Sequence, residues 1–475
     1  MPRILSDFRS KLNRPALAGL YYSASTVLMR GASVIFTPLY TRMLTKESYG
    51  IYSLYVGYMS IFSVFITLEL NGSAIYKGLS QARDGDSFIS SAQFLLLGAF
   101  SVFLSLALIF LRPLSAITGL SGSLVILLCV QTLADGVLKL RLAKDKYGYR
   151  FKLSIIEGII IALGSPLLTV ILFNVFGRRE LARIVAMLVS TLIISIPLAV
   201  NTFMRARGKL ISRSDVSFLL KYLLPQMPYF LLSSLYLQIG RTTIMHSFGT
   251  ESVALYSLAL SIGHLPTLLT VGISSALIPW CMRRLNEGES GSDRIYLIVE
   301  SIALPYGILI LLFLSFCPEL LKIMAPESYS SALPAAYAIA ICTLPSFLNT
   351  VCSSLIAGNR KSFFLSIGSV ISTLALIILN VLLTPRLGFV ATAVIQIVAN
   401  LLTLPFYFYV LKNRIHSHRL PAGRLLGYCI LLIPCAFIIL MFKEILFSRL
   451  LLAIALTVAL FGKAGEIVGF IKEKA

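Results

Sequence analysis

The sequence predicts an all-α polytopic membrane protein with about 14 transmembrane helices. We expect two parallel six-helix repeats flanking a central cleft, plus two extra C-terminal helices. Hydrophobic residues make up 57% of the 475 residues and charged residues only 13%, which is more apolar surface than a water-soluble fold of this size needs. These residues occur in runs close to the roughly 20 residues that span a bilayer. In addition, a short sequence recurs in the second half of the chain, and this recurrence predicts the two repeats.

Fourteen apolar segments, separated by short polar clusters, are predicted to cross the membrane. They are residues 17–40, 51–70, 88–111, 124–140, 153–176, 184–202, 222–240, 253–278, 295–316, 335–357, 363–383, 389–410, 425–442 and 446–462. Most of the 41 lysines and arginines fall in alternate connections, such as 141–152, 204–215 and 411–420. Basic segments are retained on the cytoplasmic side. We therefore expect a multi-pass protein of the cell inner (plasma) membrane with both termini in the cytoplasm.

The net charge of +21 does not indicate a nucleic-acid partner, because the basic residues are spread over short connections and form no basic domain. Topology and anionic lipid headgroups explain the charge better. The seven cysteines fall mostly within apolar segments and form no CxxC pair, so we expect packing residues and neither disulfides nor metal ligands. No cofactor is indicated.

The phrase "KESYGIYSLY" at 46–55 returns as "TESVALYSLA" at 250–259, a shift of 204 residues. A second echo, "RDGDS" at 83–87 and "NEGES" at 286–290, has nearly the same shift. Each half holds six segments, an even number, so both halves enter the membrane in the same direction and leave a cleft between them. The predicted organisation is a six-helix bundle over 1–210, a second over 211–424, and two additional helices with a cytoplasmic tail over 425–475.

Two stretches carry a resemblance to a known family. "TPLYTRMLTKESYGIYSLY" at 37–55 resembles the loop between the first two helices of polysaccharide flippases of the multidrug/oligosaccharidyl-lipid/polysaccharide exporter superfamily, through Pro38, Thr41, Arg42, Tyr49, Gly50 and Tyr52. "LNVLLTPRLGFVATAV" at 379–394 is similar to the family's stretch between helices 11 and 12. Where members often carry an Asp-Arg pair at the end of helix 7, this chain has Gly240 and Arg241.

The resemblance to Wzx-type O-antigen flippases implies an activity and partners. The activity is transfer of an undecaprenyl-diphosphate-linked oligosaccharide from the cytoplasmic to the periplasmic leaflet, for O-antigen, capsule or exopolysaccharide biosynthesis. The implied partners are the polyprenyl-diphosphate-linked glycan, membrane lipids, and a polysaccharide polymerase with its chain-length regulator. The chain has no phosphate-binding loop of the GxxxxGK[ST] type, so we expect coupling to an H⁺ or Na⁺ gradient.

Arg30 is the deepest isolated charge, about 20 Å from the start of its segment at a rise of about 1.5 Å per residue. A charge at this depth is expensive unless it faces a polar cavity or a partner. We expect it to face the cleft and attract the substrate diphosphate, since guanidinium binds phosphate oxygens bidentately. The alternative is a structural pair with Glu69 or Glu157.

Further polar residues are candidates for substrate binding. Asp135 and Lys139 are four apart on one helical face, which Gln131 extends by a turn. They form either a polar stripe that meets sugar hydroxyls or a self-contained structural pair. Arg42 and Arg241 end their segments on the non-cytoplasmic side, where they bind substrate or simply reach the lipid headgroups.

Four residues are candidates for ion coupling. Glu69, Glu157 and Glu300 lie near segment ends, where a low dielectric makes a carboxylate a plausible proton carrier. The alternative is interfacial pairing with residues such as Lys152 or Arg294. His264 is either a group that titrates near neutral pH or a hydrogen-bonded core histidine.

Pro225, Pro228 and Pro266 are candidate hinges of the second bundle, because proline in a membrane helix removes a backbone donor and bends the helix. Packing kinks without motion are the alternative.

Two other functions compete with a flippase. A membrane glycosyltransferase or polymerase needs a sizeable extramembrane segment or a paired acidic motif, and the sequence offers neither, so we expect no enzyme. A cation-coupled multidrug exporter of the same superfamily needs carboxylates and aromatic faces for organic cations, whereas the deepest isolated charge here is an arginine.

Overall fold

The computed structural model describes residues 34–70, 72–82, 84–148, 151–176, 179–206, 210–284, 289–359, 362–414, 422–442, 444–445, 447–452 and 454–455. All regular structure in these ranges is helical, as predicted. The α-helices are α3 (Lys46–Ile66), α4 (Ser73–Gln81), α5 (Gly85–Ile109), α6 (Leu111–Thr118), α7 (Gly122–Tyr147), α8 (Phe151–Leu172), α9 (Arg179–Arg205), α10 (Arg213–Leu223), α11 (Met227–Gly263), α12 (Thr267–Arg284), α13 (Glu289–Met324), α14 (Leu333–Gly358), α15 (Ser362–Leu387), α16 (Phe389–Arg414) and α17 (Ala422–Met441). Two 3₁₀ helices, η1 (Leu224–Gln226) and η3 (Glu327–Ala332), accompany them, and residues 34–43 and 447–452 are also helical.

Nine of the described helices are long and apolar enough to cross a membrane: α3, α5, α7, α9 and each helix from α13 to α17. The bent pair of Arg213–Gly263 and Thr267–Ser274 is a tenth if it is counted as one span. The shorter apolar helix Gly158–Leu172 covers most of the predicted segment 153–176. The multi-pass prediction is confirmed, but the count of fourteen is not, because the first and last predicted segments lie largely outside the described residues.

The chain divides into two compact units, Met1–Gln238 and Ile239–Ala475. The boundary falls inside α11, which continues from the first unit into the second. The division into repeats over 1–210 and 211–424 with an appendix over 425–475 stays a prediction.

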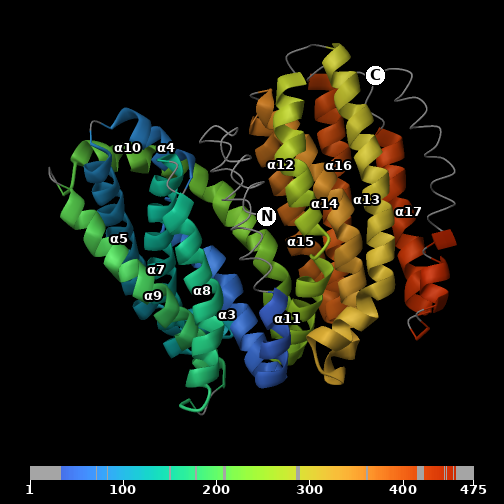
Figure 1. Ribbon diagram of the computed structural model, residues 1–475, viewed down its shortest axis with the longest axis horizontal. Helices are drawn as coiled ribbons and strands as arrows, with labels where there is room; N and C mark the ends of the chain where they lie inside the picture. The colour runs from blue at the N-terminus through green and yellow to red at the C-terminus, as the bar shows by residue number, and fades with distance from the viewer. Residues whose placement is uncertain are drawn as a thin grey trace, which may run out of the picture. The chain divides into compact units, whose positions relative to one another are not determined.

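In unit 1, α7 packs against α3, α5 and α9, and α8 packs against α9. The short helices α4 and α10 lie together at the end of the unit where α5 begins (Figure 1). Their apolar sides join a core that includes Ile75, Phe88, Leu219 and Leu223, all buried. This core holds α10 firmly against α4 and α5.

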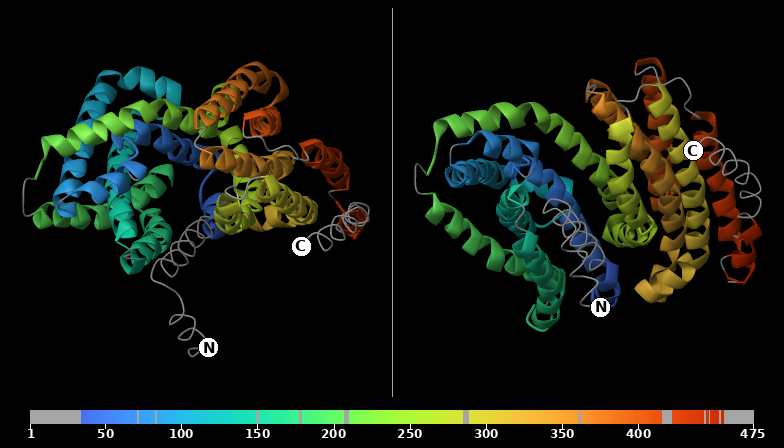
Figure 2. Two further views of the ribbon diagram at one scale, coloured as in Figure 1. Left: turned by 90° about the horizontal axis from the view of Figure 1, so that it is seen from above. Right: turned by 45° about the horizontal axis from the view of Figure 1, so that its top comes forward.

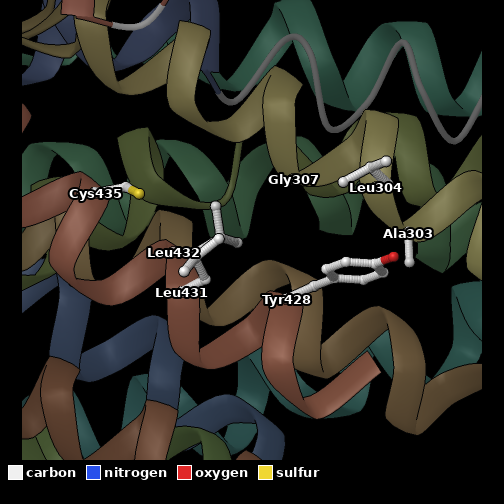
Figure 3. A pocket seen from close by; sticks show the side chains of 7 residues that line it. All are labelled: Ala303, Leu304, Gly307, Tyr428, Leu431, Leu432 and Cys435. Carbon is white, nitrogen blue, oxygen red and sulfur yellow. The ribbon is translucent and has the colours of Figure 1, made fainter. Parts of the chain in front are cut away.

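In unit 2, α14 packs against α12, α13, α16 and α17, and α15 packs against α16. Figure 2 shows α17 lying alongside α13 in two further views. A small apolar pocket remains between these two helices, where Ala303, Leu304 and Gly307 face Tyr428 and Leu432 (Figure 3). The helix α17, which covers the first of the two predicted additional helices, thus packs against α13 of unit 2.

The repeated phrase begins a helix in both units. In unit 1 the Thr45 hydroxyl caps α3 by accepting a 3.2 Å hydrogen bond from the Ser48 amide. In unit 2 the phrase follows Gly249, whose φ of 78° and ψ of 179° interrupt the helical geometry of α11. That backbone conformation is open essentially to glycine alone, so the helix that precedes Gly249 ends there and a new one begins.

Candidate functional site

In unit 1 a break between the membrane helix α3 and the short helix α4 contains a carboxylate. α3 ends at Ile66 and α4 begins at Ser73, and between them Leu68 and Glu69 have positive φ values of 50° and 52°. Left-handed geometry costs about 1–2 kcal/mol for each residue that is not glycine. The Ser63 hydroxyl compensates by donating a 2.7 Å hydrogen bond to Glu69 Oε1, and the Glu69 amide donates to Thr67 Oγ1.

The break lies beside the charged stripe of α7. Lys139 Nζ forms a 2.7 Å ion pair with Asp135 Oδ2, as the spacing predicts, and the Glu69 carboxylate also attracts the Lys139 ammonium. The side chains of Asp135 and Lys139 keep 26% and 39% of their surface exposed, so the pair is not sealed in the core. Glu69, Asp135 and Lys139, here called the acidic cluster, hold two carboxylates and one ammonium.

Gln131 does not extend this cluster as a polar stripe. It is buried and donates a 3.1 Å hydrogen bond to Thr191 Oγ1 of α9. Its Oε1 is buried and has no hydrogen-bond partner among the described residues. Gln131 therefore joins α7 to α9.

A buried arginine that the sequence analysis missed lies near the other end of unit 1. Arg183 of α9 is only 6% exposed, and its guanidinium lies 4.2 Å from the centre of the Tyr40 ring and 4.9 Å from that of Tyr52. It donates hydrogen bonds to the Tyr52 hydroxyl at 3.0 Å and to the hydroxyls of Ser165 and Thr169 of α8. Aromatic faces and hydroxyls stabilise this charge. Its position one residue before a predicted segment made it look like part of a connection.

In unit 2 the repeated phrase also contacts an arginine. Arg241 Nε donates a 3.2 Å hydrogen bond to Ser257 Oγ, and its charge acts on Tyr256 and His264. His264 is exposed, and it lies at the break where α11 ends at Gly263 and α12 begins at Thr267. The two helical segments meet at 45° across this break, which contains Pro266.

Glu300 of α13 is buried and binds the first residues of α17. Arg424 Nη1 lies 3.4 Å from Glu300 Oε1, and the Tyr428 hydroxyl donates to the same oxygen at 3.3 Å. The interfacial pairing named as the alternative for Glu300 is therefore present, although its partner is Arg424 and the side chain of Arg294 lies outside the described part.

A second ion pair ties the residues after α17 to α13. Arg449 is 1% exposed, donates a 2.9 Å hydrogen bond to Glu319 Oε2 and a 2.6 Å bond to the Ser315 carbonyl oxygen, and reaches Glu319 Oε1 with its other terminal nitrogen. Glu300 and Glu319 are nineteen residues apart, about 28 Å along a helix. The two pairs thus fasten the C-terminal residues at points separated by nearly the thickness of the hydrocarbon core.

Between α12 and α14 lies a cavity of about 410 Å³. Six hydroxyl side chains line it in two rows of identical spacing, together with Val271, Ile278 and Phe347: Thr267, Thr270 and Ser274 on α12, and Thr343, Ser346 and Thr350 on α14. Several of these hydroxyls donate to backbone carbonyls one turn earlier, as Thr270 and Thr350 do, so their oxygens remain acceptors. Among the described residues, no charged side chain lines this hydroxyl cavity.

Of the remaining predicted site residues, some lie outside the described part of the chain and others lie at exposed positions or near helix ends. Arg30 and the side chain of Glu157 lie outside the described part of the chain. Arg42 is exposed, and its Nη1 donates to the Pro38 carbonyl oxygen at 3.1 Å. Pro225 lies in η1 and Pro228 in the first turn of α11, where α10 passes into α11. All seven cysteines are free and buried, and the described residues contain no group of three His, Cys, Asp or Glu side chains that could hold a metal ion.

The family model described as "Polysaccharide biosynthesis protein" matches residues 18–285. A comparison with curated protein sequences gives no match. The fold is similar to that of the lipid II flippase MurJ in an inward closed conformation, with a TM-score of 0.72, 12% identity, and coverage of 95% of this chain and 99% of that one. It is also similar to an inward-facing multidrug resistance MATE family transporter of the MOP superfamily (TM-score 0.56, 17% identity, 84% and 95% covered). The Vibrio cholerae MATE transporter VcmN in the bent form matches with a TM-score of 0.52 and 13% identity, over 86% of this chain and 99% of that one.

Proposed function

This chain belongs to the polysaccharide biosynthesis protein family, and on that premise we propose that it is a flippase for a polyprenyl-diphosphate-linked oligosaccharide. In this proposal the glycan passes from the cytoplasmic to the periplasmic leaflet of the inner membrane by alternating access, with both termini in the cytoplasm, and no bond is made or broken. The family match covers more than half of the chain, and the fold is that of flippases and transporters of the same superfamily.

The hydroxyl cavity is the observation that carries the choice of substrate. A neutral sugar offers many hydroxyl donors, and the side chains of this cavity offer acceptor oxygens beside the ring of Phe347. An organic cation would instead need a carboxylate in the lining, and the described lining residues include none. The cavity therefore supports a glycan over a cationic drug.

We assign ion coupling to the acidic cluster. In this assignment Glu69 is the carboxylate that takes up the proton or Na⁺, beside the ion pair of Asp135 and Lys139. Irregular backbone beside a membrane helix is a common location of ion sites in transporters, and Glu69 lies in such a stretch after the end of α3. Glu157, Glu300 and His264 remain secondary proposals; the pair with Arg424 favours a structural role for Glu300.

The other proposed roles follow from the depth and position of the residues. Arg30 attracts the substrate diphosphate, with Arg42 and Arg241 assisting on the other side of the membrane. Pro266 is the main proposed hinge, since it lies at the 45° bend, and Pro225 and Pro228 are the others. The polymerase and chain-length regulator are proposed partners.

The test is glycan export in a deletion strain that carries this gene on a plasmid. We expect deletion to leave complete lipid-linked precursor in the cytoplasmic leaflet and the plasmid to restore surface glycan. Replacing Thr270 and Thr350 by valine should lower export at equal protein level, whereas replacing Ser101 and Ser105 by alanine should not, because those exposed hydroxyls of α5 make the same backbone hydrogen bonds outside the cavity. Missing precursor would indicate synthesis of the glycan, and a loss of cationic dye efflux alone would indicate a drug exporter.

A further inference from the structure

An elongated apolar groove runs along α5 in unit 1. Its volume is about 570 Å³, and every side chain that lines it is apolar, including Phe65 of α3 and Leu220 of α10. On α5 the lining extends from Phe94 to Leu106, which is about 18 Å at the helical rise of about 1.5 Å per residue. We call this feature the α5–α10 groove.

A basic cavity adjoins one end of the groove. It has a volume of about 480 Å³, shares Leu220 with the groove, and is lined in addition by Arg213, Ser217 and Lys221 of α10. Asp215 is on the same helix but does not line the cavity. Within the described part of the chain, no hydrogen bond or ion pair engages the side chain of Arg213 or Lys221. The mouth of the groove therefore carries two uncompensated positive charges.

The mouth is fixed in place by packing. Leu219 and Leu223 on the opposite side of α10 are buried in the core with α4 and α5, so the basic side of α10 faces away from that core. In Figure 1, α10 lies at the end of unit 1 where α5 begins. This end is the cytoplasmic one in the predicted topology. The residues of α5 that line the groove continue from Phe94 to Leu106.

We propose that the α5–α10 groove is where the polyprenyl diphosphate carrier first binds, with the hydrocarbon chain along α5 and the diphosphate against Arg213 and Lys221, before the diphosphate moves on to Arg30. The inference rests on the flippase function proposed above and locates the lipid part of its substrate. An arginine and a lysine together match the charge of a diphosphate. A groove of about 18 Å exceeds half of the roughly 30 Å hydrocarbon core, so a chain lying in it extends beyond one leaflet. The two positive charges at the mouth favour a diphosphate over the single phosphate charge of a headgroup such as phosphatidylglycerol.

Gly98 allows the groove to be filled without disturbing the fold. It lines the groove, lies within α5, and a Cβ atom placed on it would meet nothing within 4 Å. The matched control is Gly427 of α17, which is also helical, also has open space around it, and lines neither cavity. Gly98→Leu and Gly427→Leu thus make the same change inside and outside the groove.

The experiment uses the full-length protein in nanodiscs of zwitterionic lipid and a polyprenyl diphosphate probe that carries a photoreactive diazirine near the end of its chain. We expect cross-links on α5 and α10. Gly98→Leu, which fills the groove, and the double variant Arg213→Ala/Lys221→Ala, which removes both charges, should each lower the cross-linking about tenfold. Gly427→Leu and Lys412→Glu, a charge change on an exposed residue of α16, should leave the cross-links unchanged. Unlabelled polyprenyl diphosphate should compete with the probe.

Cross-links confined to other helices, the absence of binding by the wild-type protein, or equal loss in the Gly427→Leu control would overturn the proposal. Equal competition by phosphatidylglycerol would also overturn it, because the groove would then be a general site for anionic phospholipids. Failure of the groove is separable from failure of the flippase function: a wild-type gene that restores glycan export, with Gly98→Leu exporting equally well, rejects the groove alone.

Discussion

The guanidinium of Arg183 donates a 3.0 Å hydrogen bond to the hydroxyl of Tyr52, and the ring of the same tyrosine faces the guanidinium at 4.9 Å. Tyr52 belongs to the phrase that the chain repeats after 204 residues, where its counterpart is Tyr256. In unit 2 the charge of Arg241 acts on Tyr256, and Arg241 donates to the neighbouring Ser257. The repeated phrase thus starts a helix whose second turn contacts an arginine in each unit.

Removing the Tyr52 hydroxyl should destabilise the protein moderately. In Tyr52→Phe the ring remains beside Arg183, so only one hydrogen bond to a charged group is lost, worth about 1.5–3 kcal/mol. Arg183→Ala should cost more, because it leaves the hydroxyls of Tyr52, Ser165 and Thr169 without their donor. Thermal unfolding in detergent measures both, and the double variant should be less destabilised than the sum of the two. Strict additivity would show that the two side chains are not coupled.

Breaking the pair between Arg449 and Glu319 should loosen the C-terminal residues. Glu319→Gln leaves a guanidinium that is 1% exposed without its counter-charge, for which we expect a loss of about 2–3 kcal/mol, less than for a fully buried pair because Glu319 keeps 37% of its side chain exposed. Limited proteolysis should then cleave after α17 sooner than in the wild-type protein. Glu327→Gln, which removes an exposed acid from η3, is the control and should behave as the wild type. Equal cleavage of both variants would argue against the clamp.

The helices and one ion pair followed directly from sequence. Twelve of the fourteen predicted segments fall on described helices, because apolar length and helical periodicity are local properties. Asp135 and Lys139 pair because a spacing of four residues fixes their neighbourhood on any helix.

The tertiary partners did not follow from sequence. Arg183 contacts side chains from three separate parts of the chain, and Glu300 pairs with Arg424, which lies 124 residues away in the sequence. No local sequence pattern predicts either set of contacts. The sequence does not indicate the break after α3 either, because Leu68 and Glu69 adopt a backbone geometry that is usually found at glycine. Serine and threonine hydroxyls and the surrounding core hold these residues there, and a one-dimensional pattern does not contain that information.

Neutralising Glu69 should uncouple transport from the ion gradient. Glu69→Gln keeps the acceptor for Ser63 but removes the negative charge of this side chain from the acidic cluster. We expect gradient-driven uptake of lipid-linked glycan into proteoliposomes to fall about tenfold, the usual size of a coupling effect, while uptake without a gradient persists. Glu47→Gln changes an exposed acid in the first turn of α3 and should keep full coupling. Retained coupling in Glu69→Gln would move the ion site elsewhere.

Acid should weaken the start of α5. Asp84 caps this helix, and the Ser87 hydroxyl, followed by the Asp86 amide, holds the pKa of Asp84 below its ordinary value. A carboxyl whose pKa is lower in the folded state adds stability above its unfolded pKa of about 4, and this contribution disappears as the pH falls through the folded value. Asparagine caps helices but does not titrate, so the stability of the wild type relative to Asp84→Asn should decline between pH 5 and the acid limit. A difference that does not vary with pH would contradict the role of the charge.

Two glycines with open surroundings should respond to alanine in opposite directions. Neither Gly249 nor Gly427 would place a new Cβ within 4 Å of another atom, so steric contacts do not decide the outcome. Gly249 has a φ of 78° and a ψ of 179°, a region that is essentially closed to alanine, and Gly249→Ala should lose about 1–3 kcal/mol of stability. Gly427 is helical within α17, where alanine should add about 0.5–1 kcal/mol by reducing the freedom of the unfolded chain. Thermal unfolding of the two variants in one detergent measures both effects. A gain of stability in Gly249→Ala would mean that the turn before the second copy of the repeated phrase does not require glycine.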